Sequence, residues 1–364
     1  MFLRNTWYVA CHPEEINARP LGRKICNESI VFYRQSDGIP VALENFCPHR
    51  GAPLSLGRVK GDRLVCGYHG LEMGCTGKTV AMPSQRVGGF PAIKTYAVVE
   101  RHGFIWVWPG EQSLADPSLI PDLHWANSPE WAYGGGYYHV RSDYRLMIDN
   151  LMDLTHETYV HATSIGQREI DETPCKTQVD GDHVTLSRFM EDLPEAPPFF
   201  KMALRCHGLP DDQRVDRWQV CHFTPPSHVM LEVGVALAGH GGKEAPLDKK
   251  VDAVIVDFIT PETDTSHHYY WGFARRFQAQ DTELTDSIRE QQRKVFGEDI
   301  EVLESQQANL SAWPDRKLLM LNIDAGGVQS RRVIERHLAS EREAHAQASL
   351  SKSPMTDGPL NSSL

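Results

Sequence analysis

The chain of 364 residues lacks any apolar run long enough to cross a membrane, and its first seven residues lack the apolar core of a secretory signal peptide. It also has no basic run of five or more residues, and its formal net charge is −11. These absences argue against a membrane protein and against nucleic acid or an anionic membrane as a partner. Its eight cysteines are scattered, as is typical of reduced thiols, so we expect a cytoplasmic protein.

Two cofactor motifs are missing as well. The chain contains no G-x-G-x-x-G dinucleotide fingerprint and no C-x4-C-x2-C spacing of a plant-type ferredoxin. If the chain handles electrons from NADH, we therefore expect them to arrive through a separate reductase, with flavin and a ferredoxin-type cluster of its own.

One short motif dominates what is present. Cys47 and His49 form a C-x-H pair, and after sixteen further residues Cys66 and His69 form a C-x2-H pair. A Rieske [2Fe–2S] centre needs two thiolates on one iron and two imidazoles on the other. Each loop offers one ligand of each kind, so the pattern predicts a cluster clamped between two loops.

A structural zinc site is the alternative reading of the same four residues, because two Cys and two His also suit tetrahedral zinc. Zinc fingers usually keep like ligands together, whereas here Cys and His alternate. Glycine and proline crowd both loops, which lets backbone N–H groups approach the bridging sulfides. We favour the cluster, and we interpret Cys75 as an ordinary loop cysteine outside the pattern.

The length predicts two domains. Short alternating runs punctuated by Gly and Pro indicate an all-β domain over residues 1–110, and a Pro-rich connector follows over 111–135. Residues 136–346 form the second domain, with helices expected at 146–160, 282–312 and 327–346, strands between them, and loops at 191–212 and 239–250. We expect the Ser- and Pro-rich tail, 347–364, to be disordered.

A second metal site is suggested by His156 and His161, which lie close to Asp153. Two His and one carboxylate form the facial triad that holds non-haem Fe(II) and leaves positions open for O2. On a regular helix, residues five apart point about 140° away from each other, so the helix must distort or end between these two. Asp153 shares the face of His156 and suits a carboxylate that accepts the imidazole N–H.

The third iron ligand should come from a distant segment. Asp299 is our choice, and spacing alone leaves Glu298 and Glu301 as close competitors. Read by itself, the His pair is more often a solvated helix face. An electron carrier on the same chain favours iron, because the carried electron needs an acceptor.

Three stretches carry a resemblance to a known family. The chain resembles the oxygenase components of Rieske non-haem iron aromatic-ring oxygenases, and within them the vanillate-demethylating branch, with dicamba and toluenesulfonate monooxygenases as relatives. The similarity covers nearly the whole chain except the tail. Its most specific parts are residues 47–55, 66–73 and 149–156, and residues 322–330 add to the match.

The resemblance implies an α+β fold, with the Rieske domain followed by a helix-grip (START-like) domain in which an antiparallel sheet wraps around a long helix. It implies a homotrimer in which Asp153 bridges His69 of one subunit and His156 of the next. Asn150 matches a family residue close to the iron, and Asp299 matches the family's carboxylate ligand, which places it ahead of Glu298.

The implied activity is O-demethylation of vanillate to 3,4-dihydroxybenzoate (protocatechuate) and formaldehyde, a step in the catabolism of lignin-derived aromatics. It would use O2, a [2Fe–2S] cluster, mononuclear Fe(II), and NADH only through the reductase. The methyl-ether carbon is hydroxylated, and the resulting hemiacetal collapses. Another methoxy- or methyl-substituted aromatic acid is the alternative substrate.

An alternative of another class is an electron carrier fused to a ligand-binding domain, without oxygen chemistry. His156, His161 and Asp299 discriminate between the two, because a carrier would not need them.

We leave the substrate contacts unassigned. Arg275 and Arg276 are read as surface residues, the pair His267 and His268 as exposed, and at least one aromatic residue among 270–273 as facing the cavity.

Overall fold

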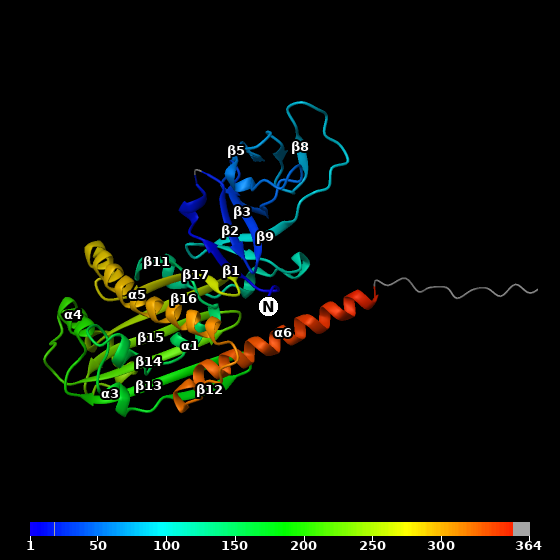
Figure 1. Cartoon of the computed structure of the whole chain (residues 1–364). Helices are drawn as coiled ribbons and strands as arrows, with labels where there is room; N and C mark the ends of the chain where they lie inside the picture. Colours follow the sequence, from blue (N-terminus) through cyan, green and yellow to red (C-terminus); the bar gives the residue numbers. More distant parts are fainter. Residues whose placement is uncertain (18, 352–364) are drawn as a thin grey trace, which may run out of the picture.

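The computed structural model describes residues 1–17 and 19–351, which contain three antiparallel sheets and two long helices (Figure 1). Two of the sheets lie in the N-terminal part of the chain. The third, together with both long helices, forms the C-terminal part. The predicted α+β organisation, an all-β domain followed by a sheet with helices, is therefore confirmed.

The larger N-terminal sheet has six strands. Their order is β1 (Tyr8–Cys11), β10 (Phe104–Trp108), β9 (Thr95–Arg101), β4 (Pro40–Glu44), β3 (Glu28–Arg34) and β2 (Leu21–Ile25). Strand β10 is buried along its whole length. Ile105 and Val107 pack into the core of this domain, whereas Phe104 and Trp106 on the other face pack against Phe258 of the C-terminal sheet. An uninterrupted apolar strand thus joins the two parts of the chain.

The smaller N-terminal sheet supports the two Cys–His loops. Its order is β5 (Arg58–Lys60), β6 (Arg63–Val65), β7 (Glu72–Met73) and β8 (Thr79–Ala81). Leu64 and Met73 are buried against Cys47 and Cys66 in one apolar cluster. The strands therefore fix the bases of both loops.

The connector contains short 3-10 turns rather than long elements. They are η3 (Gln112–Leu114), η4 (Pro117–Leu119) and η5 (His124–Asn127), and η1 (Pro13–Ile16) and η2 (Leu54–Leu56) lie earlier in the chain. Ile120, Leu123 and Trp125 are buried with Phe258 of the C-terminal sheet. The connector thus packs into the joint between the two parts.

The C-terminal sheet has seven antiparallel strands. Their order is β11 (Ala132–Val140), β17 (Ser266–Arg275), β16 (Lys250–Thr263), β15 (His228–Leu237), β14 (Val215–Thr224), β13 (His183–Leu193) and β12 (Lys176–Asp180). Helix α5 (Thr282–Ala312) lies across one face of it (Figure 1). Its buried residues recur every three or four positions and form one stripe toward the sheet. They are Ile288, Gln292, Val295, Phe296, Asp299 and Leu303.

The remaining helices are α1 (Tyr144–Leu151), α2 (Glu157–Val160), α3 (Glu169–Glu172), α4 (Pro198–Cys206) and α6 (Ala325–Ser351), with 3-10 turns η6 (Gly242–Glu244), η7 (Leu247–Lys249) and η8 (Asn322–Asp324). The predicted helix 282–312 is confirmed. The helix predicted over 146–160 is split into α1 and α2, and the loop predicted over 191–212 contains α4. Helix α6 continues beyond its predicted end, into the tail. The rest of the tail predicted to be disordered, residues 352–364, lies outside the described residues.

Two predictions about strand β17 are wrong. His267 and His268 are buried, because their strand lies between β11 and β16 and is covered on both faces. Arg275 is buried as well and donates to the backbone carbonyl of Asp281 at 2.9 Å, which fixes the start of α5. Arg276 is exposed, as predicted. Among the described helices, none is both long and apolar enough to span a bilayer.

Candidate iron centres

The two Cys–His loops have the same backbone turn. The N–H of Gly51 donates to the carbonyl of Cys47 at 2.8 Å, and the N–H of Gly70 donates to that of Cys66 at 3.0 Å. Both glycines have positive φ, +68° and +76°, a conformation that favours glycine. The repeated turn places Cys47 and Cys66 at the same position of each loop, and His49 and His69 follow them by two and three residues.

The four side chains separate by type. Cys47 and Cys66 are buried, whereas His49 and His69 are exposed, with ring centroids 4.6 Å apart. Burial, opposed by the backbone N–H of His49 and reinforced by the Cys66 thiol, raises the pKa of Cys47. The arrangement offers sulfur ligands on the inner side and nitrogen ligands on the outer side.

This separation fits a two-iron cluster better than one zinc ion. Among the described residues, the one group that brings three potential ligand atoms within 4.8 Å of one another lies elsewhere, in the C-terminal domain. The ligand atoms of the Cys–His quartet lie farther apart than this, as a [2Fe–2S] cluster requires, because its thiolates and imidazoles bind two different irons.

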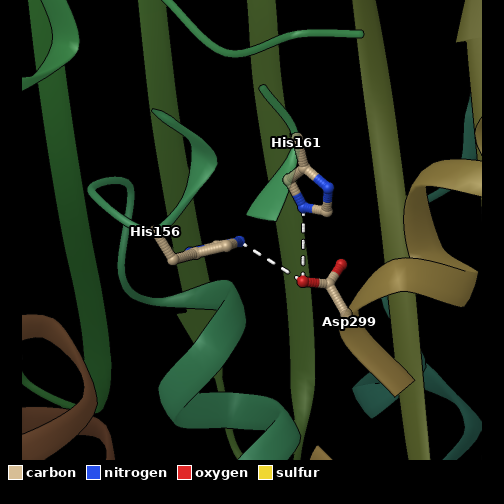
Figure 2. A group of neighbouring side chains, drawn as sticks. All are labelled: His156, His161 and Asp299. Carbon is tan, nitrogen blue, oxygen red and sulfur yellow. Dashed lines mark ion pairs between the residues drawn. The ribbon is translucent and has the colours of Figure 1, made fainter. Parts of the chain in front are cut away.

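The compact group consists of His156, His161 and Asp299, drawn in Figure 2. The Oδ1 atom of Asp299 lies 3.5 Å from Nε2 of His156 and 3.2 Å from Nε2 of His161. The two His flank the single turn of α2, and Asp299 projects from α5. The chain breaks out of helical conformation before His156, which lets both imidazoles reach one point, as the spacing of the pair required.

Two outer contacts orient the imidazoles. His156 Nδ1 donates to the backbone carbonyl of Asp153 at 2.6 Å, and His161 Nδ1 donates to Oε2 of Glu298 at 2.7 Å. Both Nε2 atoms are then free of protons in the neutral tautomer and can bind a metal. The predicted partner of His156 was the carboxylate of Asp153, but this carboxylate is 3.9 Å away and accepts instead from the N–H of Thr155.

The other two acidic candidates for the third iron ligand do not lie in the triad. Glu298 accepts from Nδ1 of His161, on the side of the ring away from Asp299, and Glu301 is exposed. Asn150 donates to Oδ1 of Asp299 at 3.0 Å, and its own Oδ1 atom is buried without a partner in the described residues. The amide of Asn150 therefore lies at the edge of the triad, where a resemblance to the family had placed it.

The electrostatics of the triad also suit a cation. Burial by itself would lower the pKa of His156, but Asp299 raises it to about 9. Burial would raise the pKa of Asp299, but the two imidazoles lower it to about 2. The buried carboxylate thus depends on positive charge beside it, which a divalent metal would supply in place of the protons. The residues fit a mononuclear iron.

A cavity opens onto the triad. Most of its wall is apolar, and Phe273 is the cavity-facing aromatic residue expected on β17; the apolar wall includes Ile165, Phe199, Phe200, Leu231, Ile255, Phe273 and Phe296. Four polar residues in the wall were missed from the sequence: Gln292, Glu157, Arg217 and Gln219. The signal for the last two was a strand in which alternate positions, facing inward, are polar.

Comparisons with known proteins agree with these two centres. Residues 6–97 match the Rieske [2Fe–2S] domain family, and residues 140–340 match the vanillate O-demethylase oxygenase C-terminal domain family. The chain is 65% identical to the vanillate O-demethylase oxygenase subunit of Pseudomonas sp. strain HR199 over 353 residues, which covers 97% of this chain and 99% of the relative.

Solved structures lead to the same result. The structure is similar to dicamba monooxygenase bound to 3,6-dichlorosalicylic acid, with a TM-score of 0.85 and 34% identity, covering 94% of this chain and 99% of the other. It is also similar to dicamba monooxygenase with non-haem iron and dicamba, with a TM-score of 0.78, 34% identity and the same coverage.

Proposed function

The chain belongs to the Rieske oxygenases of the vanillate O-demethylase type, and from this premise we propose that it converts vanillate to 3,4-dihydroxybenzoate and formaldehyde. It is a Rieske monooxygenase with a [2Fe–2S] cluster and a mononuclear non-haem iron. The observation that carries the substrate proposal is 65% identity to a vanillate O-demethylase oxygenase subunit over almost the whole of both chains.

We assign the two centres to the residues described above. Cys47, His49, Cys66 and His69 would hold the cluster, and His156, His161 and Asp299 would hold the iron. When bound, iron supplies the activation of O2 next to the substrate's methyl-ether carbon. Glu298 and the carbonyl of Asp153 hold the two imidazoles in the tautomer that binds metal.

The cavity determines how the substrate lies. Its aromatic and aliphatic walls exclude water and hold a flat ring, which favours reaction at a group pointed toward the triad. Hydroxylation of the methoxy carbon gives a hemiacetal, and this collapses to the phenol and formaldehyde. Two protons and two electrons reduce the second oxygen atom to water, so the oxygenase needs an external electron source.

The electrons are proposed to come from NADH through a separate flavin- and ferredoxin-type reductase. Within one chain, the sheet β5–β8 that carries the cluster loops lies away from α1 and the triad (Figure 1). His49 and His69 are exposed, and Asp153 is partly exposed beside an exposed apolar segment, 318–321. These features support a homotrimer in which the cluster of one subunit meets Asp153 and His156 of its neighbour.

Further parts of the proposal concern organisation and location. We propose domain limits of 1–110 and 136–346 with the connector 111–135 between them, supported by the separate sheets. We also propose a cytoplasmic location, which suits a partner that is reduced by NADH.

The test is an anaerobic purification followed by reaction with vanillate, NADH, O2 and a matched reductase. About one formaldehyde per O2 consumed is the expected result. If vanillate stimulates O2 use but no formaldehyde is released, the natural substrate is another aromatic acid. No O2 use, with both iron centres present and the cluster reduced, would favour the electron-carrier alternative.

A further inference from the structure

One wall of the cavity is polar and has no part in the chemistry proposed above. Arg217 and Gln219 point from β14 toward Glu157, at the start of α2, and all three side chains are buried. Arg217 Nη2 donates to Oε2 of Glu157 at 3.2 Å, and Gln219 Nε2 donates to Oε1 at 2.6 Å. The ring of Phe200 lies 5.8 Å from the guanidinium carbon of Arg217 and holds it from the side.

These bonds leave two buried polar atoms unused. Arg217 Nε and Gln219 Oε1 have no hydrogen-bond partner anywhere in the described residues. A buried donor and a buried acceptor without partners cost free energy unless water or a ligand meets them. Since both residues line the cavity, a bound molecule can reach this wall.

The charge of this wall is positive. Arg188 lies opposite Gln219 on the neighbouring strand β13, is 3% exposed, and donates to the carbonyls of Thr173 and Leu154 rather than to a carboxylate. Arg188 therefore adds a second buried guanidinium group close to Arg217, and Glu157 is the buried carboxylate that pairs with Arg217. The half-buried Glu169 also acts on Arg217, but more weakly than Glu157.

We propose that Arg217 binds the carboxylate of the aromatic acid through its Nε–H, and that Gln219 Oε1 accepts from a water beside that carboxylate. The assignment rests on the proposed function. Among the described Lys and Arg residues, Arg217 alone lines the cavity that also holds the triad. The acid group then lies at the polar wall, and the methoxy group points toward His156 and Asp299. Arg217 is thus the residue that selects acids over neutral methoxy-aromatics.

The competing role is purely structural, with the pair Arg217–Glu157 fastening α2 to the sheet. The test measures anaerobic binding of vanillate and of 2-methoxyphenol, which lacks the carboxylate, to the iron-loaded holoenzyme by calorimetry. The variants are the double substitution Arg217→Gln/Glu157→Gln, which removes both charges together, and Arg217→Lys, which keeps the pair but lacks Nε–H. Arg214→Gln, at an exposed site paired with Asp192, is the matched control.

We expect the Kd of vanillate to rise at least about tenfold in both Arg217 variants, the size typical of a lost charged hydrogen bond. The Kd of 2-methoxyphenol should change less than about threefold, and Arg214→Gln should match the wild type. Equal weakening of both ligands, or unchanged vanillate binding in Arg217→Lys, overturns the assignment. If the double variant does not fold, Arg217→Lys decides alone.

Failure of the proposed function can be distinguished from failure of the Arg217 assignment. If the wild type neither binds vanillate nor releases formaldehyde from it, the proposed function fails. If the wild type demethylates vanillate and Arg217→Lys binds it as tightly, only the Arg217 assignment fails.

Discussion

The two iron centres differ in how the chain builds them. The cluster ligands come from two loops within 23 residues, and the same turn is used twice. The triad combines His156 and His161 with Asp299, which lies more than a hundred residues further along the chain on another helix. A local centre depends on loop geometry, whereas a distant one depends on how α5 packs against the sheet. The two should therefore respond to mutation independently.

The largest expected effect comes from removing one ligand at each centre. Asp299→Ala leaves two imidazoles without the buried carboxylate that balances the metal, so iron should be lost and turnover should fall more than about 100-fold. The visible and EPR spectra of the cluster should be unchanged. Cys66→Ser should do the reverse, with the cluster lost and iron retained by metal analysis. If either substitution removes both centres, the comparison is wrong.

The sequence predicts the local centre better than the distant one for a physical reason. C-x-H and C-x2-H spacing fixes four ligands on two turns, because glycines at 51 and 70 allow each turn to close. Which carboxylate of α5 reaches the two His residues depends on the register of α5 against the sheet, and no sequence spacing encodes this register. Resemblance to the family was needed to prefer Asp299 over Glu298.

Burial was the main source of error in the C-terminal domain. His267, His268 and Arg275 look like surface residues in the sequence, yet strand β17, which lies between β11 and β16, buries them, and each has a partner. The predicted hydrogen bond from the His156 imidazole to the Asp153 carboxylate was wrong for a different reason. The break between α1 and α2 turns its carbonyl, not its carboxylate, toward His156. Propensity cannot show which way a loop turns its backbone.

The next effect is a pH dependence confined to the triad. Without metal, Asp299 raises the pKa of His156 to about 9 and also raises that of His161, although burial opposes both. Iron needs both imidazoles neutral, so protons compete with it at every pH below about 9. Iron affinity should fall about tenfold or more per pH unit from 9 to 7. Equilibrium dialysis of the apo-protein measures it. A flat profile over this range contradicts the prediction.

A smaller effect is expected from the outer contact on His161. Glu298→Gln keeps the shape but removes the charge that holds the Nδ1 proton, and iron affinity should fall about 10–100-fold. Glu301→Gln, on the same helix but exposed, is the control and should bind iron as the wild type does. The cluster spectrum should be the same in all three proteins. Equal iron affinity in the two variants would mean that Glu298 does not orient the ligand.

The smallest expected effect concerns Asp257, a buried residue of strand β16 in the C-terminal sheet. Burial raises the pKa of Asp257 to about 8, the hydroxyl of Tyr269 opposes this, and the charge of Asp299 adds to it. The folded state therefore holds the Asp257 proton more tightly than the unfolded chain, whose pKa is about 3.9, so this group's contribution to stability declines as pH rises from about 4 to about 8. Asp257→Asn cannot ionise and should gain a few degrees in Tm over the wild type at pH 8, with a smaller gain at pH 5.5.

The control is Asp248→Asn, in an exposed turn, which should show no such pH-dependent gain. Since the effect arises in the C-terminal sheet, the N-terminal cluster should keep its spectrum throughout. A gain equal at both pH values would mean that Asp257 is not the titrating group.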